Sequence, residues 1–497
     1  MIRPMVLVLS LLNAALLSAA DWPQWGGGPT RNAVSLEKGA PADFQPPVRD
    51  EDGKVLKPGC GVAWQAELGT RTVIPPVVAG GLVWVGTNAR EPAGNPPART
   101  WDGGVLMCFG ESDGKLLWRH RTPRLTTTVV EDCPYAALGS APLVEGDWLW
   151  YVNNRCEVVC LDIAPLRAGM GDPRELWKLD MRKEFGVFQH LPIMQAGLAA
   201  SVAADRDRLF VVTHNGVDES HVNIPAPNAP SLVCLEKATG KVLWKDGSPG
   251  KNILQCQTSS PLVCEVGGRQ QVIVGQGDGW LRSFDPATGR VLWKCDLNPK
   301  DAVYDLGGRG TRNYIVATPV LYDGRVYIPT GHNPEHGSGV GGLYCVDPTR
   351  DGDVSRELEA APKKGRPNPN SAVVWYTPPT VPADAPRVEV GKKKRDLLRD
   401  LRDFYFGRCV ATVTAHDGLV YAAEFGGLLF CFDARSGRCY WADDLKASVW
   451  GQPLWADGKV YVGTEQGEVF VYTHGKEKRQ LAKVDAGDSI HPGPVFA

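Results

Sequence analysis

Residues 431–441 read CFDARSGRCYW, and the same pattern recurs without gaps at three earlier places in the chain. In every copy a cysteine or serine precedes a tryptophan by ten positions, and a Gly-Lys or Gly-Arg pair lies between them. Self-similarity of this kind indicates a repeat architecture in which each repeat is one supersecondary unit. The three earlier copies are CFGESDGKLLW at 108–118, CLEKATGKVLW at 234–244 and SFDPATGRVLW at 283–293.

Three further copies bring the number of repeats to seven. Two carry insertions, between Cys160 and Trp177 and between Cys345 and Trp375, and one is degenerate, from Val471 to Leu481. A short Pro-Val or Pro-Leu strand and a hairpin come before most copies, so each unit is predicted to have four strands. Asp-Gly between apolar runs is a strong hairpin signal, because the tight turn requires φ > 0. Such turns are predicted at Asp323-Gly324, Asp417-Gly418 and Asp457-Gly458.

Repeated four-stranded units bury their faces against one another when they are arranged radially, and this arrangement leaves only short edges. Helical periodicity is nearly absent from the chain. The sequence therefore predicts an all-β fold, a seven- to eight-bladed β-propeller of four-stranded antiparallel blades. The seven full units are expected at about 66–119, 139–180, 197–245, 257–295, 316–376, 409–443 and 449–485.

The two ends of the repeat region suggest an eighth blade closed by both termini. Residues 62–66 resemble an isolated outer strand, and residues 494–497 resemble an isolated first strand. The two middle strands of this blade are not evident in the sequence. Two interpretations stay open: the sequence is a fragment, or residues 21–60 fill the gap.

The first twenty residues are predicted to be a secretory signal peptide. Arg3 supplies the positive charge, residues 6–17 are almost wholly apolar, and Ser18-Ala19-Ala20 gives a small-residue cleavage site. We therefore expect a periplasmic or extracellular protein, with residues 21–60 as an N-terminal extension and residues 61–497 as the propeller. No later apolar run reaches the roughly 20 residues of a transmembrane helix, so no transmembrane segment is expected. The formal net charge of −2 argues against a nucleic-acid partner.

The tryptophans of the repeat are interpreted as structural, because recurrence at one repeat position indicates packing between blades. The motif cysteines are interpreted in the same way, as small core residues. Among the other cysteines of this exported chain, Cys133 and Cys156 are candidate disulfide partners, although sequence alone does not fix the pairing. The repeat tryptophans are Trp64, Trp118, Trp177, Trp244, Trp293, Trp375 and Trp441.

On these motifs the chain resembles the PQQ-binding-like (quinoprotein-type) β-propeller family, and residues 21–27, DWPQWGG, are similar to the opening of its exported bacterial members. The resemblance implies one of two roles. One is a pyrroloquinoline-quinone alcohol dehydrogenase, and the other is a non-enzymatic propeller similar to that of the outer-membrane β-barrel assembly machinery. Dehydrogenases of this kind carry an adjacent Cys-Cys pair beside the quinone and a Ca²⁺ ion held by Glu, Asn and Asp. This chain has no adjacent cysteine pair, which favours the non-enzymatic role.

Long B–C loops lie on one face of the predicted propeller, and this face gathers much of the chain's potential ligand chemistry. These loops are residues 87–103, 214–231 and 331–341, and functional loops on a rigid scaffold are typically elaborated in this way. Imidazole and carboxylate groups at short spacing suit a divalent transition metal, and the alternative is that they cap turns or line a sugar or peptide site with Trp101. The candidate metal ligands are His214, Asp218, His221, His332, Glu335 and His336.

Residues 349–408 form an excursion rich in Pro, Lys and Arg, interpreted as a solvated loop around a short amphipathic helix at 396–406 rather than a nucleic-acid site. The sequence predicts a monomeric, non-catalytic binding or scaffold module that acts through the elaborated loop face. Its partner would be a protein or a cell-envelope polymer. The alternative function is a PQQ- or metal-dependent oxidoreductase, with PQQ or a divalent metal as the cofactor.

Overall fold

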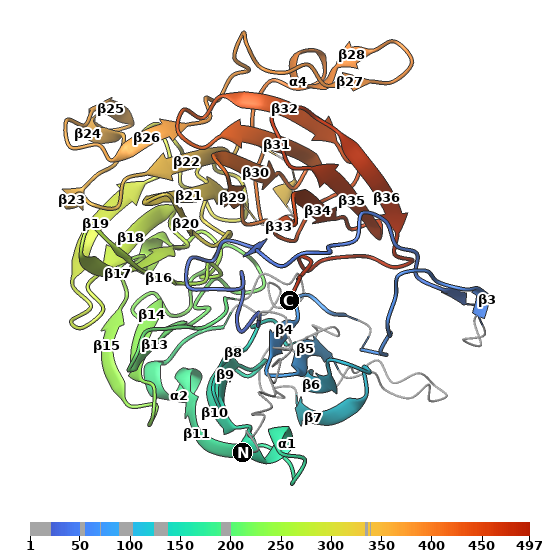
Figure 1. Ribbon diagram of the computed structural model, residues 1–497. Helices are drawn as coiled ribbons and strands as arrows, with labels where there is room; N and C mark the ends of the chain where they lie inside the picture. Colours follow the sequence, from blue (N-terminus) through green and yellow to red (C-terminus); the bar gives the residue numbers. More distant parts are fainter. Residues whose placement is uncertain are drawn as a thin grey trace, which may run out of the picture.

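The computed structural model describes residues 21–49, 55–69, 71–88, 103–123, 138–189, 200–332, 336–337 and 339–497. These residues form a ring of seven sheets around a central axis (Figure 1). We number these sheets blades 1 to 7 in chain order. Within each blade the consecutive strands A to D pair antiparallel, and strand A lies nearest the axis, where strands A of several neighbouring blades contact one another. The predicted β-propeller is confirmed. The predicted signal peptide lies outside the described residues.

The blades contain the following strands. Blade 1 has β4 (Val77–Ala79), β5 (Leu82–Asn88), β6 (Gly104–Gly110) and β7 (Leu116–Thr122), and blade 2 has β8 (Leu143–Glu145), β9 (Trp148–Val152), β10 (Glu157–Asp162) and β11 (Arg174–Asp180). Blade 3 has β12 (Ala203–Ala204), β13 (Arg208–Val212), β14 (Leu232–Glu236) and β15 (Val242–Asp246), and blade 4 has β16 (Leu262–Val266), β17 (Arg269–Gly275), β18 (Trp280–Phe284) and β19 (Val291–Asp296). Blade 5 has β20 (Val320–Tyr322), β21 (Arg325–Thr330), β22 (Gly342–Val346) and β26 (Val373–Tyr376). Blade 6 has β29 (Thr414–His416), β30 (Leu419–Ala423), β31 (Leu428–Asp433) and β32 (Cys439–Asp444), and blade 7 has β33 (Leu454–Ala456), β34 (Lys459–Gly463), β35 (Glu468–Thr473) and β36 (Gln480–Asp485).

The sequence motif is the C–D hairpin of each blade. Cys431 lies opposite Trp441 in the ladder, and a β-bulge follows the cysteine. The same pairing and the same bulge recur in the other blades, so the ten-residue spacing is set by one bulged turn. In blade 7 the turn is one residue longer, and Val471 therefore pairs with Ala482 rather than with Leu481.

The predicted A–B hairpin turns are confirmed. The two central residues of the turn have φ of 47° and 72° at Asp457 and Gly458, and 43° and 75° at Asp417 and Gly418. Positive φ at both positions gives the twist that matches the two flanking strands. Asp tolerates this left-handed conformation better than most residues, and Gly adopts it freely.

The N-terminal segment 22–35 fills the axis and reaches every blade, which the sequence did not predict. In five blades this segment makes hydrogen bonds to the first strand. In blades 3 and 4 it makes a hydrogen bond to the residue just before the first strand. The bonded pairs, from blade 1 to blade 7, are Trp22 with Val78, Pro23 with Val144, Arg31 with Val202, Arg31 with Pro261, Thr30 with Leu321, Asn32 with Ala415 and Ala33 with Trp455. Residues Val34–Ser35 continue as β1, which adds to blade 7 parallel to β33.

Arg31 is the centre of this segment. Its side chain is 1% exposed and donates to the carbonyl oxygens of Trp25 (3.0 Å), Val202 (2.8 Å) and Pro261 (3.1 Å). Burial lowers the pKa of Arg31 to about 9. Backbone carbonyls of two blades therefore bind a buried guanidinium. The planar guanidinium, with its five N–H donors, suits several carbonyl acceptors better than an ammonium group would.

The predicted eighth blade does not form among the described residues. Residues 62–66 and 494–497 lie between blades 7 and 1 but form no strand there. From the extension, β1 joins blade 7, while β2 (Val48–Arg49) and β3 (Val55–Lys57) pair only with each other and project from the ring (Figure 1). The extension therefore fills the axis instead of supplying the missing middle strands.

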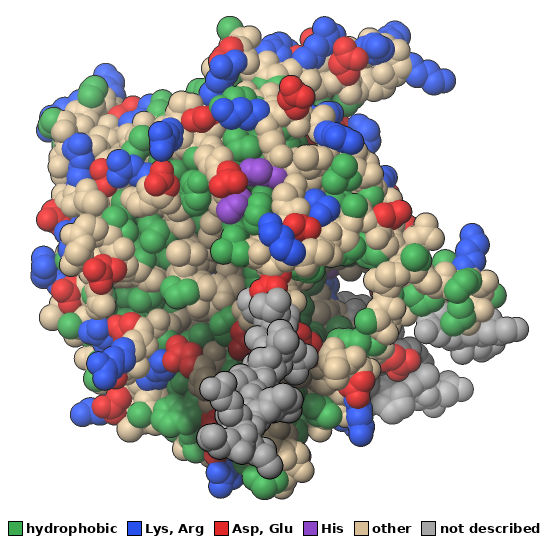
Figure 2. Space-filling model, viewed as in Figure 1, with side chains coloured by type: hydrophobic (Ala, Val, Ile, Leu, Met, Phe, Trp, Pro, Cys, Tyr) green, Lys and Arg blue, Asp and Glu red, His purple; other side chains and the backbone are tan. Residues whose placement is uncertain are grey.

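The excursion 349–408 adds short elements outside blade 5. β23 (Gly352–Asp353) joins the outer edge of blade 4, while β24 (Glu357–Ala361) with β25 (Lys364–Pro367) and β27 (Glu389–Val390) with β28 (Arg395–Asp396) form two small hairpins. The predicted helix is a single turn, α4 (Leu397–Asp400), because the chain then bends to bury Tyr405 and Phe406 in the core of blade 6. Figure 2 shows Lys and Arg side chains on the projecting β27–β28 segment and mixed charges over the rest of the face in view.

Two other helices are described, α1 (Ala164–Arg167) and α2 (Met181–Phe185). Over the described part of the chain, no helix is long and apolar enough to cross a membrane. Cys156, one of the two candidate disulfide partners, is a buried free thiol that donates to the carbonyl oxygen of Thr213. Cys133 itself lies outside the described residues.

Candidate functional site

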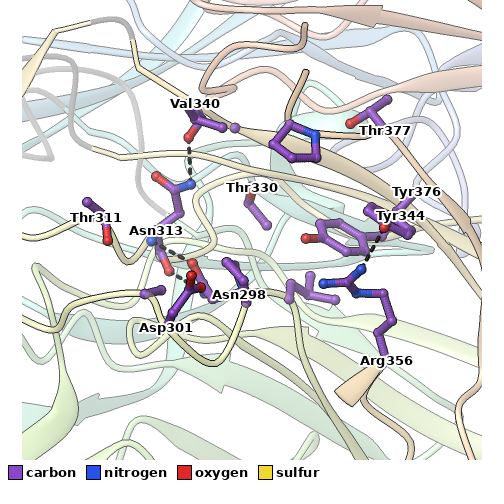
Figure 3. A pocket seen from close by; sticks show the side chains of 15 residues that line it. Asn298, Asp301, Thr311, Asn313, Thr330, Val340, Tyr344, Arg356, Tyr376 and Thr377 are labelled. Atoms are coloured by element: carbon purple, nitrogen blue, oxygen red, sulfur yellow. Dashed lines mark hydrogen bonds between the residues drawn. The ribbon is translucent and has the colours of Figure 1, made fainter. Parts of the chain in front are cut away.

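The elaborated connections gather at one end of the propeller, over blades 4 and 5. Residues 297–319 join blade 4 to blade 5, residues 331–341 join β21 to β22, and residues 377–413 join blade 5 to blade 6. D–A and B–C connections emerge on the same face of a propeller, so the strand order alone brings these three loops together. Between them lies an open pocket of about 280 Å³ (Figure 3).

One wall of the pocket is aromatic. Tyr344 on β22 and Tyr376 on β26 are cross-strand partners, and their rings stack with centroids 5.8 Å apart and planes inclined by 16°. Arg356 lies over the Tyr376 ring at 4.6 Å and donates from Nη1 to the Tyr376 hydroxyl at 2.6 Å. The cation and the hydrogen bond together fix the orientation of Tyr376, which gives this wall a rigid apolar surface.

The opposite wall is built by two asparagines on the blade 4 to blade 5 connection. Asn313 N donates to Asn298 Oδ1 (2.7 Å), and Asn298 Nδ2 donates back to the Asn313 carbonyl (2.9 Å). Asn313 Nδ2 also donates to the carbonyl of Val340 in the B–C loop of blade 5 (2.8 Å). The amide side chains therefore tie two different loops into one fixed wall (Figure 3).

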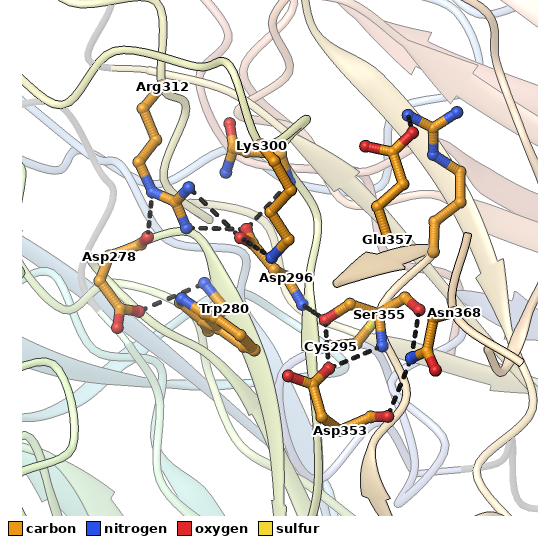
Figure 4. Close-up of polar contacts among 12 residues, drawn as sticks. Asp278, Trp280, Cys295, Asp296, Lys300, Arg312, Asp353, Ser355, Glu357 and Asn368 are labelled. Atoms are coloured by element: carbon orange, nitrogen blue, oxygen red, sulfur yellow. Dashed lines mark hydrogen bonds and ion pairs between the residues drawn. The ribbon is translucent and has the colours of Figure 1, made fainter. Parts of the chain in front are cut away.

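A charged cluster supports the other side of the same connection (Figure 4). Asp296 accepts from Lys300 Nζ (2.8 Å) and Arg312 Nη2 (2.7 Å), and Arg312 Nε donates to the Asp278 carbonyl (2.9 Å). The Lys300 ammonium lies 5.0 Å from the centroid of the Trp280 ring. A second open pocket of about 280 Å³ lies here, so the connection has a cavity on each side.

The structure brings together three of the predicted metal ligands, His221, His332 and His336. His336 Nδ1 lies 2.6 Å from His332 Nδ1, and the His221 and His336 ring centroids are 6.0 Å apart. Burial, with smaller contributions from Arg408 and His336, lowers the pKa of His332 to about 3. A separation of 2.6 Å is that of a hydrogen bond, so the Nδ1–H of one ring donates to the Nδ1 of the other.

This cluster adjoins the pocket through Arg408. Its guanidinium donates to the carbonyl of His336 (3.0 Å) and to Asn313 Oδ1 (3.3 Å), so one residue connects the histidine loop to the amide wall. Tyr314 follows Asn313 and lies edge-on to His332, with ring centroids 5.3 Å apart. The histidines and the pocket are therefore parts of one surface.

The other predicted ligands lie elsewhere. His214 is buried and accepts from the Ala200 amide at Nε2 (2.9 Å), and burial lowers its pKa to about 4. Asp218 accepts from Ser220 and Asn223 within its own loop, as a turn-capping aspartate does. Glu335 and most of the predicted loop 87–103, including Trp101, lie outside the described residues.

Among the described residues we assign no set of side chains to the quinone and Ca²⁺ site that the resemblance implied. Within the described ranges, no three His, Cys, Asp or Glu side chains are arranged so that they could hold a metal ion. Tyr314 packs with Leu254, Cys256 and Val410 in an apolar cluster, which offers few of the oxygen ligands that Ca²⁺ needs. We therefore assign no chemical step to such a group.

Sequence reasoning missed the aromatic wall, although the repeat contained a signal for it. Because Cys345 pairs with Trp375, their neighbours Tyr344 and Tyr376 must face each other in the same ladder. Two tyrosines that face each other at the end of a blade indicate a binding surface, although the two residues are far apart in the sequence. Nothing local in the sequence indicates that Arg356, from the excursion, lies over Tyr376.

Four-stranded antiparallel blades arranged around one axis define the class of β-propellers. A family model described as "Outer membrane protein assembly factor BamB" matches residues 169–377 and 402–489. These residues are more than half of the chain, which therefore belongs to this family.

Two curated relatives match shorter parts of the chain. Polyvinylalcohol dehydrogenase of Sphingopyxis sp. (strain 113P3) is 28% identical over 144 residues, 27% of this chain and 21% of that protein. Outer membrane protein assembly factor BamB of Shewanella oneidensis is 27% identical over 175 residues, 32% of this chain and 38% of that protein. The matches thus span well under half of either relative. The crystal structure of BamB from Moraxella catarrhalis is 13% identical, with a TM-score of 0.46 over 82% of this chain and 86% of that one.

Proposed function

We propose that this chain is an exported scaffold that holds a segment of a protein partner in the pocket over blades 4 and 5. The observation that carries the proposal is the rigid aromatic wall of Tyr344 and Tyr376 facing the amide wall of Asn298 and Asn313 across an open pocket. Apolar walls with a few fixed polar groups are typical of binding sites, and the two walls come from loops of adjacent blades on a rigid scaffold.

The free hydrogen-bonding capacity of the pocket suits a peptide. Thr311 Oγ1 accepts from Val303 N (2.9 Å) and Thr377 Oγ1 accepts from Leu343 N (2.9 Å), which leaves both hydroxyl protons for a ligand. An aromatic or apolar side chain would pack on Tyr376 while its carbonyl groups accept from these hydroxyls. The volume of about 280 Å³ accommodates one such side chain and its backbone rather than a folded domain.

We place the protein in the periplasm or outside the cell, on the basis of the predicted signal peptide at residues 1–20. The relative from Shewanella oneidensis is named as an outer membrane protein assembly factor, which supports an envelope protein as the partner. The relative from Sphingopyxis is named as a dehydrogenase, so an oxidoreductase is the second outcome that the experiment must distinguish.

Site-specific photocrosslinking in cells tests the proposal. A benzoyl-phenylalanine at Thr311, which is exposed at the rim of the pocket, is expected to give a discrete crosslinked envelope protein. The same group at Arg435, exposed on a C–D turn of the opposite face, is expected to give none.

Two tyrosine variants separate the pocket from a general loss of stability. Tyr376→Ala is expected to abolish the crosslink from position 311. Tyr440→Ala is the matched control, because Tyr440 also has an arginine over its ring (Arg438, 6.0 Å) and a bonded hydroxyl (Asp433, 2.8 Å), but lies on blade 6 outside the pocket. Equal effects of the two variants contradict the proposal, as does dye-linked alcohol oxidation by the purified chain supplied with PQQ and Ca²⁺.

A further inference from the structure

Five repeat tryptophans contact the blade that follows them in the same way. The indole N–H donates to a carbonyl in the C–D turn of that blade, and in most of these contacts the glycine of the turn lies against the ring. A Cβ atom on Gly289, for example, would overlap the indole of Trp244. The donor and acceptor pairs are Trp64 with Glu111 (2.8 Å), Trp177 with Lys237 (3.3 Å), Trp244 with Pro286 (2.9 Å), Trp375 with Ala434 (2.8 Å) and Trp441 with Gly475 (3.0 Å).

In four of these contacts an aromatic ring on strand C of the following blade packs on the tryptophan. This ring belongs to the residue directly after the first position of the ten-residue motif. A closed contact therefore takes a carbonyl, a turn glycine and an aromatic side chain from the following blade. The ring pairs, with their centroid distances, are Trp64 with Phe109 (6.3 Å), Trp244 with Phe284 (6.1 Å), Trp375 with Phe432 (6.2 Å) and Trp441 with Tyr472 (5.5 Å).

Trp118 of blade 1 has none of these three partners on blade 2. Trp293 donates to Gln271 of its own blade, so Trp118 is the repeat tryptophan without an indole hydrogen bond in the described part of the chain. A Cβ atom on either glycine of the blade 2 turn, Gly169 or Gly171, would meet nothing within 4 Å. The residue after Cys160 is Leu161 instead of an aromatic residue.

An insertion in blade 2 accounts for the missing turn contacts. Residues 163–173 lengthen its C–D hairpin and contain α1. Arg167, the last residue of α1, donates to Asp147 Oδ1 (2.8 Å) and to the carbonyl of Gly146 (2.8 Å). Asp147 and Gly146 form the A–B turn of the same blade, so this ion pair fixes the inserted residues there and no turn glycine reaches Trp118.

A pocket of about 380 Å³ lies where the contact is incomplete, between β7 of blade 1 and β9, β10 and β11 of blade 2. This volume is within the range of about 300–1,000 Å³ that is typical of ligand sites. Trp118 and His120 line the blade 1 side, with ring planes inclined by 9° and centroids 5.8 Å apart. The Trp118 ring is partly exposed here, which leaves aromatic surface available to a ligand.

The blade 2 side of the pocket carries two pairs of opposite charge. Arg155 Nε lies 3.7 Å from Glu157 Oε1, and Lys178 Nζ lies 3.4 Å from Glu175 Oε2. Both distances exceed those of strong charged hydrogen bonds, about 2.7–2.9 Å, so donors and acceptors of both pairs remain available to a ligand. The four charges cancel, which favours a neutral ligand that has hydroxyl groups.

Two other titratable groups face the pocket from β7. Burial, partly offset by Glu175, lowers the pKa of His120, so this ring is neutral at pH 7. Arg121 is exposed and adds one positive charge at the rim.

We propose that the pocket between blades 1 and 2 binds a neutral saccharide. One pyranose ring packs its C–H face on Trp118 and His120, because an aromatic ring offers a flat apolar surface. The hydroxyl groups at the edge of the sugar donate to the carboxylates of Glu157 and Glu175 and accept from Arg155 and Lys178. The site shares no residue with the pocket over blades 4 and 5, so either proposal can fail without the other.

Isothermal titration of the purified chain with cellotetraose, a neutral saccharide of four pyranose rings, tests the proposal. One site per chain with a submillimolar Kd is expected. Sorbitol has similar hydroxyl groups but no ring to pack on the tryptophan, and it is expected to give no binding heat at the same concentrations.

Two tryptophan variants test the location. Trp118→Ala is expected to weaken cellotetraose binding at least about tenfold, since a central aromatic residue carries much of the affinity of a binding site. Trp244→Ala is the matched control, because Trp244 is also partly exposed but lies in a closed contact with Pro286 and Phe284. The control is expected to lower the melting temperature and to leave the affinity unchanged.

A third variant fills the pocket without removing a contact. Leu161→Phe places an aromatic residue at the position where four closed contacts have one. The new ring is expected to pack on Trp118, to raise the melting temperature and to abolish cellotetraose binding. Because this variant is expected to be more stable than the unaltered chain, its loss of binding would not come from unfolding.

Four results overturn the proposal. They are the absence of cellotetraose binding at millimolar concentration, equal binding of sorbitol, an unchanged affinity in Leu161→Phe, and an equal loss of affinity in Trp118→Ala and Trp244→Ala.

Discussion

Acidification is expected to destabilise this fold through two buried histidines. His214 and His332 are both 2% exposed, and burial lowers the pKa of His214 to about 4 and that of His332 to about 3. Both rings are therefore neutral in the folded chain at pH 5, whereas an unfolded histidine with a pKa of about 6.5 is charged there. The unfolded chain binds more protons over this range, so the free energy of unfolding falls as the pH falls.

The size of the effect follows from the two pKa values. The stabilisation by each neutral ring is fully present above pH 6.5 and is lost as the pH falls towards its folded pKa. Between pH 7 and pH 5 the loss is about 2 kcal/mol for each histidine and about 4 kcal/mol for the pair. Urea unfolding, followed by tryptophan fluorescence at pH 7, 6 and 5, measures it.

Variants assign the pH dependence to the two rings. His214→Gln and His332→Gln each lose stability at pH 7 but are each expected to remove about 2 kcal/mol of the fall between pH 7 and pH 5, and the double variant about 4 kcal/mol. His120→Gln on β7 is the comparison, because this residue is exposed and burial lowers its pKa less than those of His214 and His332, so its removal is expected to change the slope less. A double variant with the pH dependence of the unaltered chain would refute the reasoning.

Three further predictions concern other parts of the molecule. Arg31→Met removes the donor to three carbonyls, two of them in fully buried hydrogen bonds, and is expected to cost about 3 kcal/mol of unfolding free energy in urea titration; a cost below about 1 kcal/mol would mean that the axial segment is not held through this residue. Gly437→Ala places a Cβ against the Trp375 ring at a backbone φ of 72°, and a fall in melting temperature of roughly 4 °C or more is expected; an unchanged melting temperature contradicts the packing described. Metal analysis of protein purified without chelator tests the divalent metal predicted from sequence at the histidine cluster: because no three described His, Cys, Asp or Glu side chains could hold a metal ion, less than about a tenth of an equivalent per chain is expected; about one equivalent, lost in His332→Asn with His336→Asn, would contradict this expectation.

The blades could be predicted from sequence because their information is local. A ten-residue spacing between Cys431 and Trp441 specifies one bulged hairpin, and Asp457-Gly458 specifies one tight turn. Seven repetitions of such local signals leave few folds that bury all the sheet faces. The same logic would have paired Tyr344 with Tyr376.

The candidate site depended on contacts between distant segments, and sequence indicated it only in part. Loop sorting placed His221, His332 and His336 on one face, and the structure gathers them there. His214 has the same residue type and lies in the same loop as His221, but it turns inward to the Ala200 amide. Its direction is set by tertiary packing, which no short motif encodes.

The sequence by itself determined the repeat, the number of complete blades and the face that carries the long loops, because strand pairing and turns act over about ten to twenty residues. Only the tertiary structure decided that residues 22–35 fill the axis, that Arg31 binds carbonyls of two blades, and that residues 62–66 and 494–497 pack between blades 7 and 1. Most of those contacts join residues more than a hundred positions apart. These contacts form only when the ring of blades closes. Ring closure depends on the whole fold, and it brings residues from both ends of the sequence next to blades that are distant in the sequence.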